Sequence, residues 1–178
     1  FSGLPSIGPR QATRLAFHLV RLGKSSIADI AQSIYQLQEL KHCPECFFVS
    51  SGSCPMCSDS KRRKDVVAIV EKETDVISLE KTRKFNGVYL VLGELKKSGF
   101  LESEQKLKLN HLKSKGVYSE IILAVNHTTY GDFTASLLTQ ELKESAKKIT
   151  RLGRGIPTGG EIEFADEETL GSALDNRT

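Results

Sequence analysis

Apolar positions recur with two different periods along this chain of 178 residues. In residues 1–40 they are spaced three and four apart, first at Leu15, Leu19 and Leu22 and then at Ile27, Ile30, Ile34 and Leu37. This spacing predicts two helical stretches, the second from about Ser26 to Leu40. Residues 41–64 contain too few large apolar side chains to fold unaided.

From Asp65 onward, short runs of β-branched and aliphatic residues alternate with stretches of helical periodicity. The runs predict strands at 66–70, 88–92, 120–125 and near 148–152. The stretches between them predict helices ending near Arg83 and spanning 131–145. This alternation is typical of an α/β fold with a mostly parallel sheet. Asp166 is the predicted N-cap of a short helix near the end of the chain.

Composition sets few limits on function. Hydrophobic residues make up 39% and charged residues 26% of the chain, which is ordinary for a globular protein. No apolar run reaches the length of a membrane span, and no signal-peptide pattern follows Phe1. We therefore expect a cytoplasmic protein and, because the chain does not begin with methionine, a short segment before Phe1.

The positive charge is concentrated in the first third of the chain. Residues 1–64 contain nine Lys and Arg against four Asp and Glu, a balance of +5, while the net charge of the whole chain is only +3. An uneven basic excess indicates a polyanionic partner such as nucleic acid, although a solvated surface gives the same count.

All four cysteines lie close together in the sequence, as two C-x-x-C pairs separated by seven residues: Cys43, Cys46, Cys54 and Cys57. Two such pairs can supply the four thiolates of a closed tetrahedral Zn²⁺ site, which predicts a structural zinc knuckle without an open catalytic position. The alternatives are two disulfides, which are disfavoured in a chain without a secretion signal, or a redox-active pair, which needs no second pair nearby.

A short turn near the start precedes a helix with a basic face. Gly8 permits a tight turn and Pro9 suits the first helical position. Arg10 and Arg14 follow at a spacing of four, so free amides and arginines on one face could hold phosphates. The segment resembles the helix-hairpin-helix motif that grips the DNA backbone, with Ser6 in place of that motif's usual first glycine. The alternative is a capped amphipathic helix with arginines facing water.

The α/β half has one acidic residue at the carboxyl end of its first strand, the edge where function gathers in parallel sheets. Glu71 follows that strand, and Asn126 follows the third. The pattern resembles the Toprim domain of topoisomerases and primases, whose catalytic members add an Asp-x-Asp to hold Mg²⁺. Here that position reads Asn126-His127-Thr128, so we expect no DNA cleavage; a magnesium-dependent nuclease or topoisomerase-like enzyme is the alternative.

Taken together, these parts resemble the RecR family of bacterial recombination mediators over nearly the whole chain. The matching motifs are Leu4-Pro5-x-Ile7-Gly8-Pro9 through His18, Val70-Glu71 through Glu80, and Gly155-x-Pro157-x-Gly159-Gly160 through Leu170. Two stretches depart from the family pattern. Tyr130-Gly131-Asp132 stands where the family has glutamates on both sides of the glycine, and residues 94–109 are lysine-rich without the family's proline and glycine.

The resemblance implies four regions: a helix-hairpin-helix at 1–40, a four-cysteine zinc finger at 41–64, a Toprim-like domain at 65–153 and a C-terminal packing or oligomerisation segment at 154–178. It implies a ring-shaped homo-oligomer, a tetramer, that clamps single- and double-stranded DNA in DNA repair and associates with the nucleoid. It also implies action with RecO, and in many bacteria RecF, to help load the recombinase. Gly8, Arg10 and Arg14 are the implied DNA contacts, and Glu71 and Asp132 the implied partner contacts. A pure protein-interaction module is a further alternative.

Overall fold

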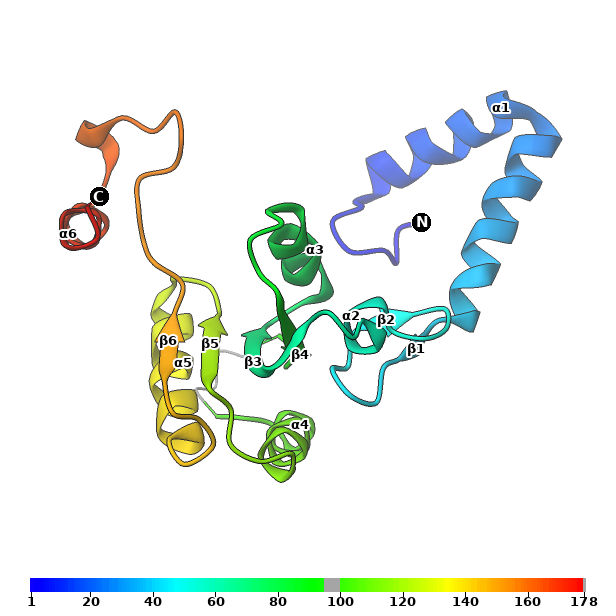
Figure 1. The fold of residues 1–178 in the computed structure, drawn as a ribbon. Helices are drawn as coiled ribbons and strands as arrows, with labels where there is room; N and C mark the ends of the chain where they lie inside the picture. Colours follow the sequence, from blue (N-terminus) through cyan, green and yellow to red (C-terminus); the bar gives the residue numbers. More distant parts are fainter. Residues whose placement is uncertain (95–99, 178) are drawn as a thin grey trace. The chain divides into compact units, whose positions relative to one another are not determined.

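The computed structural model describes residues 1–94 and 100–177 and divides into two compact units, Phe1–Lys41 and His42–Thr178 (Figure 1). Residues 95–99 of the lysine-rich stretch lie outside the described residues. None of the described helices combines the length and the apolar character needed to cross a membrane.

The first unit consists of a loop and one broken helix. Helix α1 (Pro9–Gln36) continues into a single 3-10 turn, η1 (Leu37–Glu39). Its backbone leaves the helical region at Gly23, where φ is +88° and ψ is 169°. A side chain at such a positive φ is strained, so glycine suits this break. Figure 1 shows the two halves of α1 running in different directions, which confirms the prediction of two helical stretches.

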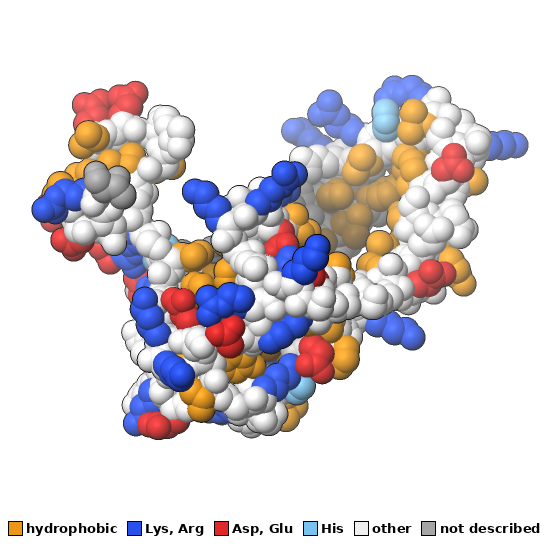
Figure 2. Space-filling view, viewed as in Figure 1, with side chains coloured by type: hydrophobic (Ala, Val, Ile, Leu, Met, Phe, Trp, Pro, Cys, Tyr) orange, Lys and Arg blue, Asp and Glu red, His pale blue; other side chains and the backbone are white. Residues whose placement is uncertain are grey.

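Helix α1 has no buried residue. Most of its large apolar side chains are exposed, including Phe17 at 64%, Val20 at 68% and Tyr35 at 62% of their surface. Figure 2 shows apolar side chains along this helix beside lysine and arginine. A helix that keeps its apolar side in water lacks the packing from which most helical stability comes.

The second unit begins with the cysteine-rich segment. Two very short strands, β1 (Lys41–His42) and β2 (Val49–Ser50), form a small sheet, and one turn of helix, α2 (Pro55–Ser58), follows. Pro55 occupies the first turn of α2, where its missing N–H costs nothing. Regular structure is therefore minimal here, as the shortage of apolar residues predicted.

A four-stranded parallel sheet forms the centre of this unit, in the order β4-β3-β5-β6. The strands are β3 (Arg63–Val70), β4 (Gly87–Val91), β5 (Glu120–Ala124) and β6 (Ile149–Arg151). Helices α3 (Glu73–Lys81), α4 (Ser103–Ser114) and α5 (Thr129–Leu142) connect them, and η2 (Ile162–Phe164) and α6 (Glu167–Asp175) follow. The predicted parallel α/β architecture is confirmed.

Successive side chains of β3 alternate between two cores. Val67 and Ile69 pack with α4 and α5 on one face, whereas Ala68 and Val70 pack with α3 on the other. The second core also includes Cys43, Cys46 and Cys54, so the cysteine-rich segment is continuous with the sheet.

The sequence reading did not predict α4. Lysines interrupt its apolar spacing, yet Lys108 is only 8% exposed, because its stem is buried while its Nζ pairs with Glu104 at 2.9 Å. The predicted N-cap of α6 is confirmed, since an oxygen of Asp166 accepts from the N–H of Thr169 at 2.9 Å.

Candidate metal centre and phosphate-binding surface

The four cysteine thiols converge on one point. Their sulfur atoms all lie within 4.8 Å of one another, and Sγ of Cys46 lies 3.5 Å from Sγ of Cys54. That separation is too long for a disulfide, whose sulfurs are about 2.05 Å apart. It is close to the distance of about 3.8 Å between thiolates around a tetrahedral Zn²⁺ with bonds of about 2.3 Å. The residues therefore fit one metal ion.

Local turns aim each pair inward. The N–H of Phe47 donates to the Cys43 carbonyl at 2.9 Å, and Phe47 adopts φ of +62° to close that turn. The N–H of Glu45 donates to Sγ of Cys43 at 3.4 Å. In the second pair, the N–H of Ser58 donates to the Cys54 carbonyl at 3.0 Å.

The pKa values of Cys46 and Cys57 are shifted in opposite directions. A hydrogen bond from Cys46 lowers the pKa of Cys57 to about 6. The pKa of Cys46 is raised by that same hydrogen bond and by burial, since this side chain is only 1% exposed. A metal ion that binds here must displace the shared protons, because thiolates are the ligands. Among the described residues, the cysteines are the one group of three or more His, Cys, Asp or Glu side chains placed to hold an ion.

The cysteine cluster is fixed directly to the parallel sheet. The backbone N–H of Val91 in β4 donates to the carbonyl of Cys46 at 2.8 Å. The ring of Phe47 packs edge-on against His111 of α4, with the ring centroids 5.6 Å apart. The ammonium of Lys108 lies 5.2 Å from the centroid of the Phe47 ring. An ion pair between Glu45 and Lys115 adds a further link.

The N-terminal turn leaves the start of α1 open. Ser6 adopts φ of +63°, so the position of the motif's usual first glycine does require a left-handed backbone. Gly8 is the N-cap with extended φ of −77°, and no side chain caps the helix. The free backbone amides in the first turn of α1 can therefore bind an anion, and the positive end of the helix dipole favours this binding.

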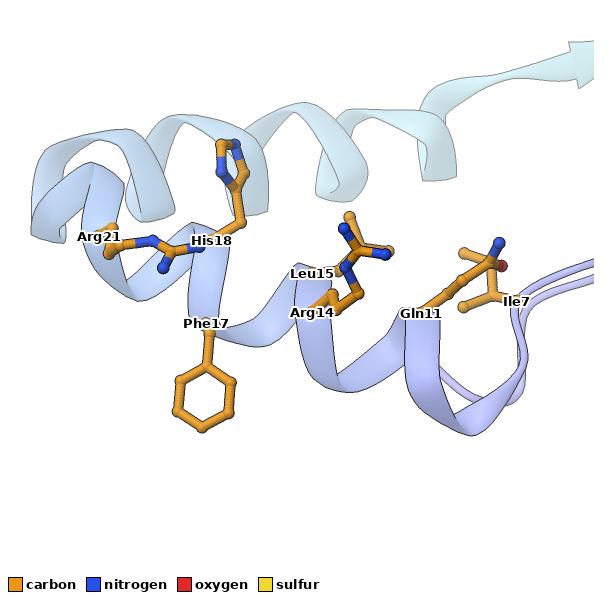
Figure 3. A pocket seen from close by; sticks show the side chains of 7 residues that line it. All are labelled: Ile7, Gln11, Arg14, Leu15, Phe17, His18 and Arg21. Carbon is orange, nitrogen blue, oxygen red and sulfur yellow. The ribbon is translucent and has the colours of Figure 1, made fainter.

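Arginines line this exposed half of α1. Arg10 and Arg14 are both exposed, and the structure gives neither an ion pair among the described residues. An open hollow of about 690 Å³ is lined by Arg14, His18 and Arg21 together with Ile7, Gln11, Leu15 and Phe17 (Figure 3). Arg10 is not part of its lining. The sequence reading missed Arg21, although its spacing of seven from Arg14 was the available helical signal.

At the carboxyl edge of the sheet, Glu71 is buried. Its side chain is 8% exposed, and Oε1 accepts from the backbone N–H of Asn126 at 2.9 Å. The carboxylate thereby fixes the loop after β5 to the end of β3. Partner contact by Glu71 stays a prediction, and this burial does not favour it.

Two guanidinium groups occupy the same edge. Asp132 lies 2.6 Å from Nη1 of Arg151 and 2.7 Å from Nη2 of Arg154. Arg154 also donates to Nδ1 of His127 at 2.9 Å and pairs with Glu168 of α6. The arginines, Arg154 first, lower the pKa of Asp132. The sequence did not predict Arg151 or Arg154 as site residues, because only folding brings them to this edge.

Close packing brings Asp132 to these arginines. A Cβ on Gly131 would lie 1.8 Å from the Asn126 carbonyl oxygen, so only glycine lets the first turn of α5 approach the loop after β5. The N-cap Thr128 accepts from the Gly131 N–H at 3.1 Å and fixes that turn.

The basic run Lys61–Lys64 is tied into the fold. Arg62 donates to both carboxylate oxygens of Glu80, and Glu80 also accepts from the Tyr89 hydroxyl at 2.6 Å. Arg63 pairs with Asp65 at 2.9 Å, and Nζ of Lys64 donates to the Cys57 carbonyl at 2.8 Å. Arg62, Arg63 and Lys64 therefore all have partners within the second unit.

The fold and its sites define a class of protein. A cluster of four cysteines that fits one metal ion is joined to a parallel Toprim-type sheet. Arginines pair with Asp132 at the carboxyl edge of this sheet, and a basic helix comes before both in the sequence. The Toprim domain family matches residues 65–153, and the family described as RecR, C-terminal, matches residues 155–178.

Relatives match almost the whole chain. The Recombination protein RecR of Clostridium perfringens is 36% identical over 100% of this chain and 92% of its own length. Those of Rubrobacter xylanophilus and Thermus thermophilus are 38% and 37% identical, each covering 99% of this chain and 91% of the relative. The chain belongs to the RecR family.

Proposed function

We propose that this protein is a non-catalytic, DNA-binding recombination mediator in DNA repair that acts with RecO, and in some bacteria RecF, to load the recombinase. One observation carries the DNA-binding part: the uncapped start of α1 lies beside arginines that have no ion pair among the described residues. Membership of the RecR family supports the mediator role.

In this proposal Gly8, Arg10 and Arg14 contact the DNA backbone. The lack of a Cβ at Gly8 lets a phosphate approach the free amides of α1, and the arginines bind neighbouring phosphates. Backbone contacts carry no sequence information, so we expect binding to single- and double-stranded DNA without sequence preference.

A gel-shift assay with both kinds of DNA tests this proposal against the pure protein-interaction module. We expect both DNAs to shift, and the affinity to fall steeply as salt rises, because counterions are released on binding. Failure to shift either DNA at low salt would favour the interaction module.

We infer that the cysteines hold one structural Zn²⁺. Four thiolates leave no open position for a substrate, and the buried sulfurs take the place of an apolar core in a segment that has few apolar side chains. When bound, the ion supplies folding free energy to this segment. Metal analysis of protein purified without added zinc should find one zinc per chain; finding no metal and two disulfides would contradict the assignment.

The absence of DNA cleavage is also part of the proposal. Asp132 already has two guanidinium partners and Glu71 is engaged with Asn126, so neither is free to bind Mg²⁺. Incubation with supercoiled plasmid and Mg²⁺ should leave the plasmid intact. Reproducible nicking that Glu71→Ala abolishes would establish the enzymatic alternative.

Oligomerisation accounts for the exposed apolar side of α1. Because α1 has no buried residue, its apolar side chains need a cover, and a ring of copies, most simply a tetramer, supplies one. Solution mass with and without DNA tests this part. A strict monomer under both conditions would contradict the clamp.

Partner contacts are assigned to the carboxyl edge of the sheet. Asp132 is 39% exposed there and is the better candidate for RecO contact than the buried Glu71. A protein with these partners works in the cytoplasm, near the nucleoid.

A further inference from the structure

A hollow of about 340 Å³ lies where three parts of the second unit meet. The sheet lines it with Val67 and Val88, helix α4 with Leu112, and the cysteine-rich segment with Glu45 and Cys57. Sites for small molecules are typically cavities of about 300 to 1,000 Å³ with a mostly apolar lining and a few polar groups. The size and the lining of this hollow meet that description.

The outer side of β4, next to this hollow, is closed to a further strand. The N–H of Val91 donates to the Cys46 carbonyl at 2.8 Å, and the Gly87 carbonyl accepts from Arg62 at 3.0 Å. Tyr89 lies between these two positions of β4 and is only 2% exposed. A small molecule therefore fits the hollow better than an extended peptide does.

The apolar lining of the hollow belongs to one of the two cores. Val67 and Leu112 are buried members of the core cluster, and Val88 packs against it. Tyr118 belongs to the same cluster, is 7% exposed and also lines the hollow. An apolar group that entered the hollow would exchange water for these side chains, and this transfer favours binding.

The hydroxyl of Tyr118 is a hydrogen-bond donor without an acceptor. Among the described residues it has no partner, and it is not one of the unpaired polar atoms that the fold seals from solvent. Burial and the negative charge of Glu45 raise the pKa of Tyr118, so the hydroxyl keeps its proton. A largely buried hydroxyl without a partner favours a ligand that accepts a hydrogen bond.

The charged residues that line the hollow are Lys64, Lys115 and Glu45, two cations against one anion. Nζ of Lys64 donates to the Cys57 carbonyl at 2.8 Å, and Nζ of Lys115 donates to the carboxylate and the carbonyl of Glu45. The hydrogen bond from Lys115 lowers the pKa of Glu45, so this carboxylate is ionised. An ammonium has three N–H donors, so each lysine keeps at least one for a further acceptor. The remaining positive charge favours an anionic ligand.

We propose that this hollow binds a small organic carboxylate with an aromatic or branched apolar body. The apolar body packs against the core residues of the lining, and the carboxylate accepts hydrogen bonds from the Tyr118 hydroxyl and from the ammonium groups of Lys64 and Lys115. The bound molecule links the cysteine-rich segment to the sheet and to α4. This site lies outside the DNA-binding helix, so it goes beyond the proposed function and does not depend on it.

Isothermal titration calorimetry with the full chain tests the proposal. The probes are 4-phenylbutyrate and 4-phenylbutylamine, which share an apolar body and differ in charge. We expect the carboxylate to bind about tenfold more tightly than the amine or better, because the two lysines attract the first and repel the second. Tyr118→Phe keeps the ring and should weaken binding of the carboxylate about tenfold, since a hydrogen bond to a charged group is lost. The same change at the exposed Tyr130 is its control.

Two double variants separate the charge of the hollow from the net charge of the protein. Lys64→Met with Lys115→Met leaves Glu45 as the charged group of the lining, so it should reverse the preference between the two probes. Lys106→Met with Lys113→Met removes the same charge from α4 outside the lining and should leave both affinities unchanged. Circular dichroism of each variant verifies that the fold is retained.

Methyl NMR locates the bound carboxylate. We expect the methyl signals of Val67, Val88 and Leu112 to shift when 4-phenylbutyrate is added. Unchanged signals, equal affinity for the two probes, or equal losses in the two double variants would overturn the proposal. Displacement of 4-phenylbutyrate by an equal concentration of inorganic phosphate would show a simple anion site. Dissociation of the oligomer by 4-phenylbutyrate would assign the hollow to a second copy, and either result would also overturn the proposal.

Discussion

The two units of this protein use arginine in opposite ways. In Phe1–Lys41, the described structure gives Arg10 and Arg14 no ion pair, and no residue of the unit is buried. In His42–Thr178, Arg62, Arg151 and Arg154 each pair with a carboxylate and are at most 25% exposed. Arginines held by carboxylates are unavailable to phosphates, whereas Arg10 and Arg14, which we propose as DNA contacts, have no such partner among the described residues.

The contrast extends to what stabilises each unit. The second unit has two apolar cores, one of which includes the cysteine cluster, whereas the first unit has no buried residue. The second unit thus has cores of its own, and the first needs a cover. We infer that assembly and DNA binding concern the first unit, while the second supplies a stable base.

Loss of the metal centre should produce the largest effect and confine it to the second unit. Cys46 is the most buried ligand, at 1% exposure, and Cys46→Ser should abolish zinc binding and cost several kcal/mol of stability. Thermal unfolding and metal analysis measure this, with Ser53→Ala in the same loop as the control. A zinc-free Cys46→Ser variant that unfolds at the temperature of the unmodified protein would contradict the account.

The structural arginines should matter for stability and not for DNA. Arg62 is 13% exposed and its partner Glu80 is 32% exposed, so Arg62→Ala should cost about 2 kcal/mol, because it leaves a partly buried carboxylate unpaired. Its neighbour Arg63 is 59% exposed, and Arg63→Ala should cost less than about 0.5 kcal/mol. Denaturant unfolding measures both. Equal costs would show that the ion pair of Arg62 is not the stabilising contact.

A smaller effect should appear in acid. The arginines hold the pKa of Asp132 below its ordinary value of 3.8, so the folded state binds the proton less readily than the unfolded state. The stability that these ion pairs contribute is fully present above pH 3.8. It is lost as the pH falls through the lower pKa that Asp132 has in the folded protein. Asp132→Asn lacks this contribution, so its stability should approach that of the unmodified protein as acid is added. If the difference in stability between Asp132→Asn and the unmodified protein stayed constant as the pH fell, the ion pairs would be excluded as the cause of that difference.

Local patterns predicted the features that depend on neighbouring residues. The β-branched runs indicated the strands, the C-x-x-C spacing indicated the cysteine cluster, and Asp166 was recognised as a cap, because each signal lies within a few residues. Helix α4 was missed, since burial of Lys108 along its stem contradicts the usual polarity of lysine.

Contacts between residues that are far apart in the sequence could not be predicted from it. The chain alone gives no sign that Arg151 and Arg154 meet Asp132, or that Glu71 holds the Asn126 amide, because these residues are far apart until the sheet forms. The same limit applied to the basic run, where the partner of Arg62 is eighteen positions away, at Glu80. The sequence could count charges, but only the fold distinguishes the paired ones from the free ones.

The most direct test of the account is the salt dependence of DNA affinity in two double variants. Arg10→Ala with Arg14→Ala should weaken binding sharply and reduce the slope of log affinity against log salt by about 2, since each lost phosphate contact lowers it by about 1. Lys81→Ala with Lys84→Ala removes the same charge from the second unit and should leave both nearly unchanged. Equal losses in the two variants, or an unaltered slope in the first, would contradict the claim that the free arginines of α1 bind DNA.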